Sequence, residues 1–412
     1  MSRVVIAGGG QAGFQVAHSL RLAGFEGSVT VSAEEDRLPY QRPPLSKAYL
    51  QEDFGFDRLQ LRPESFFEQN RIDLKLADPV TAIDRAAGSV SLASGTVLPF
   101  DHLVLALGAR NRVLPLPGAD VAGVHLLRGA EDAERFREAL HSAERLVVIG
   151  GGFIGLEVAA SARKRGVAVT VLEAADRLMG RVVSPEISGF FLEAHRAMGT
   201  EVIFGAKVLA LTGTTAVTGV ETADGHYPAD LVLVAAGVLP NAELAAAAGL
   251  RTEGGVVVDA FMATEDSRIF AIGDCAVFHS RHAEGWVRLE SVQNAVDQAK
   301  CVAARIMGGD VPYDSVPWFW SDQGSFKLQI VGITAAADHV HSAGSLEEGR
   351  LVTYCFKGDR LLGIETVNRP GEHMAGRKLL SGDLQLARAE VERHDFDLKA
   401  HLSALAKASV AP

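Results

Sequence analysis

The stretch "RVVIAGGGQAGFQVAHSLRLAG" (residues 3–24) decides the fold of this chain. It opens with an apolar run that ends at Ala7, passes through Gly8, Gly10 and Gly13, and continues with apolar residues at helical spacing. Glycines at these three positions permit a tight turn, a close approach of the backbone to a pyrophosphate, and close packing of a helix on the preceding strand. The stretch therefore predicts a strand–turn–helix unit that binds a dinucleotide.

An acidic residue completes this first unit. A second strand in "SVTVSAEE" (28–35) reaches Glu34, which lies 34 − 13 = 21 residues after Gly13. A carboxylate about 20 residues beyond the last glycine is the expected acceptor for ribose hydroxyl groups. A glycine turn alone is a weak signal, but strand, turn, helix and acid in this order form a complete fingerprint, and we expect FAD in this site.

The same design occurs a second time in "RLVVIGGGFIGLEVAASARKRGVAVTVLEAADR" (145–177). Its glycines are Gly150, Gly152 and Gly155, and Glu173 follows 173 − 155 = 18 residues after the last one. Glu173 would repel a 2′-phosphate, and the adjacent "EAA" offers no arginine to neutralise it. The second site is therefore predicted to prefer NAD(H), although two nearby arginines, at positions 177 and 181, leave NADP(H) open.

Two strand-containing segments lead the chain from one nucleotide unit to the other, at 100–118 and at 229–244, where the second reaches Gly237. The strand at 269–272 returns to the first unit and ends in Gly273-Asp274, which places a carboxylate at the ligand crevice. An ordinary turn at a strand end would have the same sequence. Ser291 is a candidate N-cap for a helix that extends to Met307.

The predicted fold is α/β, with two Rossmann-like dinucleotide-binding domains of which the second is inserted in the first. From residues 316–323 onward the pattern changes to strands, with a hairpin at 353–366 and a short helix near 373–382, which predicts an α+β domain. The predicted boundaries are an FAD-binding domain at 1–117, an NAD-binding domain at 118–244, the rest of the FAD-binding domain at 245–318, and the C-terminal domain at 319–412.

Composition narrows the classes of function. The net charge of −11 argues against nucleic acid as a partner, and no apolar run approaches the roughly 20 residues that a membrane span requires. The cysteines Cys275, Cys301 and Cys355 lie far apart, so we expect neither a disulfide scaffold nor a metal site. The chain enters a strand at its first residues, and we expect a protein of the reducing cytoplasm.

The chain as a whole resembles the NADH-dependent ferredoxin reductases of the putidaredoxin reductase type, including the reductase components of aromatic-ring dioxygenases. The most specific motifs are, in order, "RPPLSK" (42–47), "GGGFIGLE" (150–157), "IFAIGDCA" (269–276), "ESVQNA" (290–295) and "VPWFWSDQ" (316–323). The resemblance covers nearly the whole chain and implies a glutathione-reductase-like arrangement of the domains. Where the family has Ala-Thr-Gly, this chain has Leu107 in the middle position, so a threonine hydrogen bond is lost although the backbone turn should survive.

The resemblance also implies site residues. Lys47 is expected to pair with Glu157 near the place where nicotinamide and flavin stack, and Trp320 is expected beside the isoalloxazine ring. Two prolines, Pro43 and Pro44, stiffen the segment before Lys47, although a bare Ser-Lys after a proline turn is more often a surface feature. The predicted catalytic residues are Lys47, Glu157 and Trp320. The predicted cofactor-binding residues are Gly8, Gly10, Ala12, Gly13, Glu34, Arg42, Lys47, Val80, Ala106, Gly108, Arg128, Gly150, Gly152, Ile154, Gly155, Glu157, Glu173, Gly237, Gly273, Asp274, Val292 and Trp320.

The expected function is transfer of hydride from NADH to FAD, followed by single-electron transfer to a [2Fe–2S] ferredoxin that supplies a cytochrome P450 or a Rieske oxygenase. No cysteine occurs before position 275, so thiol chemistry at the flavin is not expected. Two alternatives stay open: a cysteine-independent NADH oxidase or small-molecule reductase, and a flavoprotein of the apoptosis-inducing-factor type that binds partners. The sequence favours a monomer without settling the oligomeric state, and it predicts a local basic patch for ferredoxin.

Overall fold

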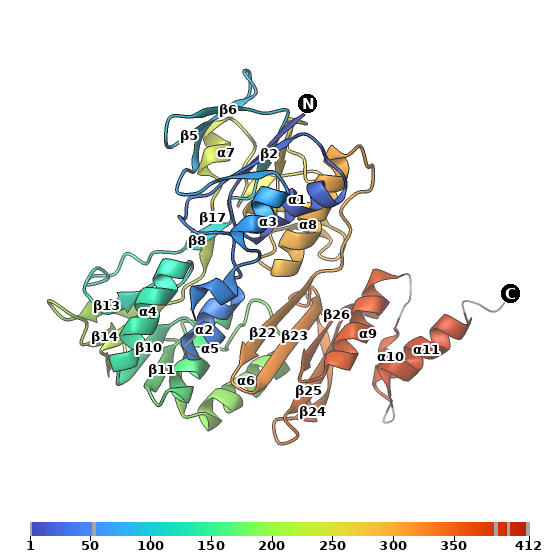
Figure 1. Cartoon of the computed structure of the whole chain (residues 1–412). Coiled ribbons are helices and arrows are strands. Elements are labelled where there is room, and N and C mark those ends of the chain that lie inside the picture. The colour runs from blue at the N-terminus through green and yellow to red at the C-terminus, as the bar shows by residue number, and fades with distance from the viewer. Residues whose placement is uncertain (1, 52–54, 383–385, 394–395, 409–412) are drawn as a thin grey trace. The chain divides into compact units, whose positions relative to one another are not determined.

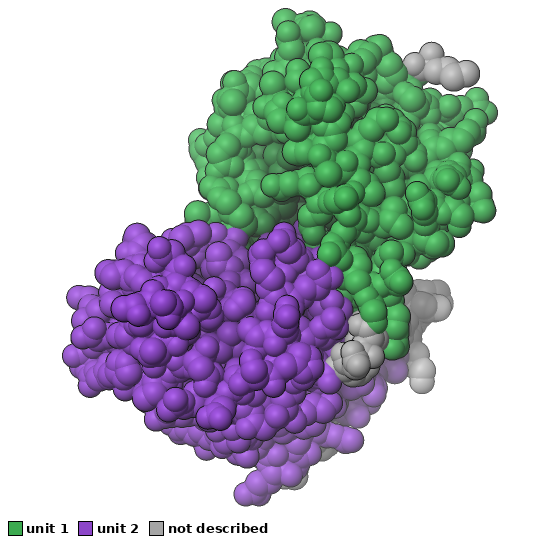
Figure 2. Space-filling view, turned by 60° about the vertical axis from the view of Figure 1, so that its left-hand side comes forward, with its two compact units in different colours: residues 1–41, 55–110, 238–315 green, residues 42–54, 111–237, 316–412 purple. Residues whose placement is uncertain are grey.

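The computed structural model describes residues 2–51, 55–382, 386–393 and 396–408. Two compact units account for the chain, and Figure 2 colours them separately. Unit 1 comprises residues 1–41, 55–110 and 238–315, and unit 2 comprises residues 42–54, 111–237 and 316–412. The segment with Lys47 belongs by its contacts to unit 2. This division is coarser than the four predicted segments, so the predicted domain boundaries stay a prediction.

A five-stranded parallel sheet with the order β19-β7-β1-β2-β3 forms the centre of unit 1. Its strands are β1 (Arg3–Ala7), β2 (Ser28–Ser32), β3 (Ile72–Lys75), β7 (His102–Leu105) and β19 (Ile269–Ala271). The helices α1 (Gln11–Leu22) and α8 (Val292–Ile306) pack against each other in the same unit. Because the strand order changes direction at β1, its carboxyl end is the expected position of a ligand crevice.

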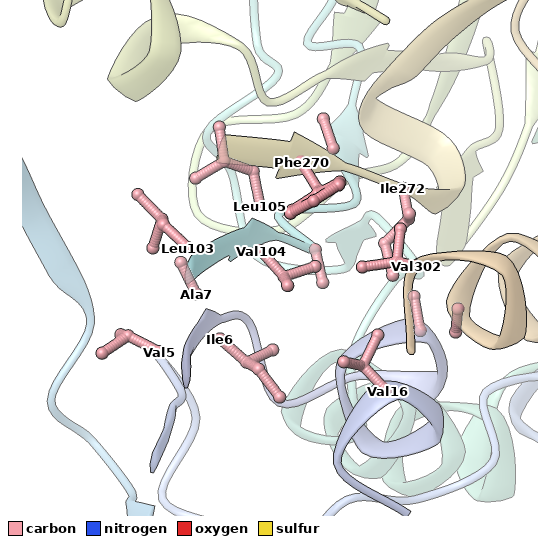
Figure 3. Close-up of a cluster of buried hydrophobic side chains, with 14 of the residues drawn as sticks. Val5, Ile6, Ala7, Val16, Leu103, Val104, Leu105, Phe270, Ile272 and Val302 are labelled. Carbon is pink, nitrogen blue, oxygen red and sulfur yellow. The ribbon is translucent and has the colours of Figure 1, made fainter. Parts of the chain in front are cut away.

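The core of unit 1 is built from the apolar runs that predicted these strands (Figure 3). Ile6, Val104 and Phe270 come from three neighbouring strands, and Val16 and Val302 come from α1 and α8. All five are nearly inaccessible to solvent. Strands that are covered on both faces favour uninterrupted β-branched and aromatic residues, which explains why these segments read as continuous apolar runs.

Smaller elements complete unit 1. They are η2 (Phe56–Leu59), α3 (Glu64–Gln69), β4 (Val80–Asp84), β5 (Ser89–Leu92), β6 (Val97–Pro99), β8 (Ala109–Asn111, which runs into unit 2), β17 (Val238–Pro240), α7 (Glu243–Ala247), β18 (Val256–Val257), η3 (Gly273–Cys275), β20 (Ala276–Ser280) and β21 (Gly285–Val287).

Unit 2 repeats the strand–turn–helix design in a second parallel sheet, with the order β12-β11-β10-β16-β9. Its elements are η1 (Pro43–Ser46), α2 (Ala48–Gln51), β9 (Val124–His125), α4 (Ala130–Ser142), β10 (Arg145–Ile149), α5 (Phe153–Lys164), β11 (Ala168–Leu172), α6 (Pro185–Ala197), β12 (Thr200–Ile203), β13 (Val208–Thr212), β14 (Gly219–Thr222), β15 (His226–Pro228) and β16 (Leu231–Val234). The order β10–α5–β11 matches β1–α1–β2 in unit 1, as the two glycine motifs predict.

The C-terminal part of unit 2 is an antiparallel sheet with a helix packed on β23 and β26 (Figure 1). The sheet has the order β22-β23-β26-β25-β24, and the predicted hairpin is confirmed by the pairing of β25 with β26. The elements are β22 (Trp318–Gln323), β23 (Phe326–Gly332), β24 (His339–Ser345), β25 (Arg350–Lys357), β26 (Arg360–Val367), α9 (Pro370–Ser381), α10 (Arg388–Val391) and α11 (Leu398–Ala408). Across the described ranges, none of the helices is both long enough and apolar enough to cross a membrane.

A buried carboxylate joins this sheet to α6. Glu365 in β26 accepts hydrogen bonds from the Ser184 hydroxyl (2.5 Å), the Thr334 hydroxyl (2.7 Å) and the Thr353 hydroxyl (3.0 Å). Ser184 is the N-cap of α6, and its backbone N–H also points at Glu365 (3.1 Å). Burial raises the pKa of Glu365, and the surrounding donors oppose that rise. The N-terminus of α6 is thus tied to the antiparallel sheet by a buried polar contact.

Candidate active site

Both glycine turns have the geometry that a dinucleotide requires. A Cβ atom on Gly13 would lie 1.9 Å from the Gly8 carbonyl oxygen, and a Cβ atom on Gly155 would lie 2.2 Å from the Gly150 carbonyl oxygen. Any other residue at either position would push the helix away from its strand. The equivalence of these two contacts confirms that the motif folds in the same way twice.

The helices that follow these turns begin without a side-chain cap. Gly10 and Gly152 are the N-caps of α1 and α5, neither first turn contains an acidic residue, and no atom lies within 4 Å of a Cβ built on either glycine. By contrast, the N-caps Ser184 and Ser291 of α6 and α8 accept a hydrogen bond from their own first turns. The free N–H groups at α1 and α5 suit an anionic group such as a pyrophosphate.

Glu173 lies directly after β11 and beside the second turn. Its Oε2 accepts a hydrogen bond from the Gly151 N–H (2.6 Å), and its Oε1 accepts one from the Ala175 N–H (2.8 Å). Arg177 donates to the Gly180 and Val183 carbonyl oxygens of its own loop, so it is not directed at this carboxylate. The guanidinium of Arg181 lies instead near Gly237, 3.6 Å from a Cβ built there. The site thus presents a carboxylate that is held in place, as recognition of two ribose hydroxyl groups requires.

Glu34 does not occupy the equivalent position in unit 1. The Gly8 N–H bonds to the Ser32 carbonyl oxygen, whereas the Gly150 N–H bonds to that of Leu172. The counterpart of Glu173 is therefore Ala33, and Glu34 is the next residue and is exposed. The connection between α1 and β2 is longer than that between α5 and β11, and counting residues from the last glycine does not reveal this shift. The role of Glu34 in binding stays a prediction.

The carboxyl ends of β7 and β19 carry several other predicted residues. Gly8 approaches the Ala106 carbonyl so closely that a Cβ atom would lie 2.2 Å from its oxygen. A Cβ atom on Gly273 would lie 3.4 Å from that of Ala12, at the start of α1, and Asp274 follows within η3. The structure therefore brings these residues together near the first glycine turn.

The turn after β7 contains Leu107, where the resemblance leads one to expect a threonine, and its backbone is held by Asn241. The Asn241 side chain donates to the Leu107 carbonyl oxygen (2.9 Å), and the Asn241 N–H donates to that of Gly108 (3.0 Å). Gly108 has a φ of +66°. Asn241 thus holds this turn through the backbone carbonyls of residues 107 and 108 and not through the side chain of Leu107.

Nearby, Ser291 caps α8 by accepting from the Asn294 N–H (3.0 Å), as predicted, and Val292 is the first residue of that helix. Val80 is the first residue of β4 and is half-buried. A contact of either Val80 or Val292 with a cofactor stays a prediction.

The ion pair implied by the resemblance is present within unit 2. Lys47 Nζ lies 2.7 Å from Glu157 Oε2, and the side chains are 15% and 4% exposed. Lys47 also donates to the Pro43 carbonyl oxygen (3.1 Å), so the proline-containing turn η1 fixes the position of the ammonium group. The Ser46 hydroxyl donates to Glu157 Oε2 (2.5 Å), and the Ser321 hydroxyl donates to Oε1 (2.6 Å). These two serines were not predicted.

Aromatic residues from β22 lie in the same unit. The rings of Trp318 and Trp320 lie 5.7 Å apart, tilted by 33°, and Phe319 contacts Phe153 of α5 at 4.6 Å. Trp320 is half-buried and is adjacent in sequence to Ser321. Its strand therefore carries both an accessible indole ring and a hydroxyl that reaches Glu157.

The remaining predicted residues of unit 2 lie at the beginnings and ends of elements. Arg42 donates to the Arg128 carbonyl oxygen (3.1 Å) just before α4. Ile154 lies in the first turn of α5, and Gly237 lies just before β17 with a φ of +91°. Their contacts with cofactors stay predictions.

The pKa values of the three thiols are raised, so these cysteines are not activated. Burial raises the pKa of Cys275 to about 11 and that of Cys301 to about 11, and it also raises the pKa of Cys355. All three are free cysteines. Within the described residues, three or more metal-ligating side chains do not gather at any one place.

Comparison with known proteins gives a consistent assignment. Residues 2–299 match the family model described as pyridine nucleotide-disulphide oxidoreductase, and residues 318–402 match the model described as reductase C-terminal. Rhodocoxin reductase from Rhodococcus erythropolis is 50% identical over 398 residues, which cover 96% of this chain and 93% of the relative.

Two crystal structures are also similar. The ferredoxin reductase for the CYP199A2 system of Rhodopseudomonas palustris has a TM-score of 0.95 and 48% identity, with 97% of this chain and 100% of that chain covered. The covalent putidaredoxin reductase–putidaredoxin complex has a TM-score of 0.94 and 40% identity, with 98% of each chain covered. The two glycine turns and the added C-terminal sheet are thus explained together: the chain belongs to the pyridine nucleotide-disulphide oxidoreductase family and carries the C-terminal domain of its ferredoxin reductases.

Proposed function

We propose that this chain is an FAD-dependent NADH:ferredoxin oxidoreductase. The observation that carries the proposal is the Lys47–Glu157 ion pair, in which Lys47 is half-buried and Glu157 is buried, in a chain whose three thiols all have raised pKa values. A disulfide-reducing member of the family would need a reactive thiol at the flavin. In its absence, electrons leave the cofactor directly, and the relatives that share this chain's full length are named as reductases of electron-transfer proteins.

FAD fits the first glycine turn and NAD(H) fits the second. The first turn has an open helix N-terminus at Gly10 and a close-packed Gly13, which together form a cradle for a pyrophosphate. The second has the same cradle and also Glu173, whose fixed carboxylate accepts from ribose hydroxyl groups and disfavours a 2′-phosphate. Bound FAD supplies the conversion of a two-electron donor into single electrons.

The residues around Lys47 have distinct tasks in this proposal. On the resemblance, Lys47 is assigned to the reactive edge of the flavin as a fixed positive charge, and Glu157 orients that charge through the 2.7 Å ion pair. The Pro43 carbonyl restricts the ammonium group further. A preoriented charge needs no reorganisation when hydride arrives, and that is the source of its effect on rate. Trp320 is assigned to the flavin ring on the resemblance.

The proposed acceptor is a [2Fe–2S] ferredoxin that supplies a cytochrome P450 or a Rieske oxygenase. The putidaredoxin reductase–putidaredoxin complex and the reductase of the CYP199A2 system support this acceptor class. We also propose a cytoplasmic location, because all three cysteines are free thiols.

The proposal is tested by anaerobic reduction. The purified protein, reconstituted with FAD if necessary, is titrated with NADH while the flavin absorbance is recorded. We expect the flavin band to bleach with about one NADH per FAD, and to recover when an oxidised [2Fe–2S] ferredoxin is added. A protein that binds no FAD, or whose bound FAD is not reduced by NADH, contradicts the proposal.

A further inference from the structure

We propose that Ser321, held by Gln323 and His195, is a positioning residue for the Lys47–Glu157 ion pair. This inference rests on the proposed function, because it concerns the same charge pair. It assigns a task to three buried polar residues that the resemblance had not connected to the site. All of them lie in unit 2.

These residues form a continuous chain of side-chain hydrogen bonds. His195 Nε2 lies 3.0 Å from Gln323 Oε1, Gln323 Nε2 donates to Ser321 Oγ (3.2 Å), and Ser321 Oγ donates to Glu157 Oε1 (2.6 Å). His195, Gln323 and Ser321 are each 0% exposed, and Glu157 is 4% exposed. The chain therefore runs through the protein interior from α6, through β22, to α5.

The direction of each hydrogen bond follows from the donors available. The Gln323 amide donates to Ser321 Oγ, so the single hydroxyl proton of Ser321 is left to donate to Glu157. The Gln323 carbonyl oxygen accepts, so His195 carries its proton on Nε2. Burial lowers the pKa of His195, which agrees with a neutral ring whose Nδ1 has no hydrogen-bond partner among the residues that the structure describes. Three aligned dipoles thus direct their positive ends toward the Glu157 carboxylate.

The two carboxylate oxygens of Glu157 accept from different donors. Oε1 receives the hydroxyl of Ser321, whereas Oε2 receives Lys47 and the hydroxyl of Ser46. Without the Ser321 hydroxyl, the buried Oε1 has lost the donor that faces it, and the carboxylate can rotate so that its charge is shared differently with Lys47. Ser321 thereby acts on the ammonium group through Glu157, and it need not touch a substrate.

The experiment measures flavin reduction by NADH in anaerobic stopped flow for wild type, Ser321→Ala, Lys47→Met and the double variant, all as holoenzymes. Ser321→Ala should lower the limiting rate about tenfold, which corresponds to about 1.4 kcal/mol, and should leave the dissociation constant of NADH within about twofold. In the Lys47→Met background, the same change should alter the rate by less than about twofold, because the charge that Ser321 positions is absent. Ser321→Cys keeps the size and a weak donor and should restore part of the rate.

Controls separate a local role from a loss of packing. Thr366→Val removes a buried hydroxyl group from the same sheet, which donates to the Gln329 carbonyl oxygen. In this variant NADH should reduce the flavin at the wild-type rate. Gln323→Leu removes the amide that orients Ser321 and should slow reduction about threefold, so it provides a second test if Ser321→Ala does not fold.

The outcomes are distinguishable. A wild-type rate for Ser321→Ala, or an equal loss in the presence and absence of Lys47, overturns this inference while leaving the proposed function in place. A wild-type rate for Lys47→Met overturns both the proposed role of Lys47 and this inference.

Discussion

Separate and joint replacement of Lys47 and Glu157 measures how strongly the central ion pair is coupled. Lys47→Met leaves a carboxylate of 4% exposure that still accepts from the hydroxyls of Ser46 and Ser321. Glu157→Gln leaves an ammonium group of 15% exposure with the Pro43 carbonyl oxygen. Each single change therefore leaves one polar group partly unsatisfied, and the double change removes both charges together.

The size of the coupling follows from the distance. Two unit charges 2.7 Å apart attract by about 6 kcal/mol at an effective dielectric constant of about 20, and desolvation of the buried pair offsets most of this attraction. A net interaction of about 2 kcal/mol lies within the range of interaction energies that double-mutant cycles give for residues in contact. We therefore expect each single variant to slow flavin reduction, and the double variant to be about thirtyfold faster than the product of the two single effects.

The assay is anaerobic stopped-flow reduction at saturating NADH, with flavin content and thermal midpoint measured for every variant. Lys164→Met is a matched control, because it removes a lysine from the same helix α5 at an exposed position. It should change neither the rate nor the flavin content. Purely multiplicative effects of the two site variants, with an interaction below about 0.5 kcal/mol, would show that the ion pair is not a functional unit.

Two further predictions concern the second nucleotide site and the thiols. Glu173→Arg should lower kcat/KM for NADH about tenfold or more and raise the NADPH/NADH ratio of kcat/KM, because a phosphate partner replaces the acceptor of the ribose hydroxyl groups. Glu221→Arg introduces the same change of charge elsewhere and serves as the control. An unchanged ratio in Glu173→Arg would contradict this role. Iodoacetamide at pH 8 should leave Cys275 of the native protein unmodified, because its pKa is raised to about 11 and only about one thiol in a thousand is ionised. The reactivity of Cys275 should appear only as the pH approaches 11. Rapid inactivation at pH 8 would contradict this prediction.

The sequence predicts the two nucleotide-binding turns well because their signals are local. Gly13 and Gly155 each follow an apolar strand and open a helix, and the physical requirement for glycine is contained within a few residues. The structure confirms both turns, and it confirms the cap at Ser291 for the same reason. Local signals are less reliable for the acidic residue that follows the second strand of each nucleotide-binding unit. Glu173 lies where predicted, but the strand register gives Ala33 the equivalent place in unit 1, and a residue count cannot detect a longer connection.

Contacts between distant segments could not be predicted from the residues alone. Lys47 and Glu157 are 157 − 47 = 110 residues apart, and only the family resemblance connected them. The chain from His195 to Ser321 was missed, because single polar residues in apolar elements are usually interpreted as exposed. One signal was available: Ser321 and Gln323 are two residues apart in "WFWSDQ", so a strand places both on one face, and both are buried.

The most direct test of the account is the reduction of cytochrome c by NADH with and without a [2Fe–2S] ferredoxin. If the flavin passes single electrons to ferredoxin, cytochrome c reduction should depend on added ferredoxin and should fall as salt screens a local docking patch, with a screening length of about 10 Å at 0.1 M. Flavin reduction by NADH, measured in the same buffers, should change much less. Cytochrome c reduction that is equally fast without any of a panel of [2Fe–2S] ferredoxins would contradict the ferredoxin-reductase assignment.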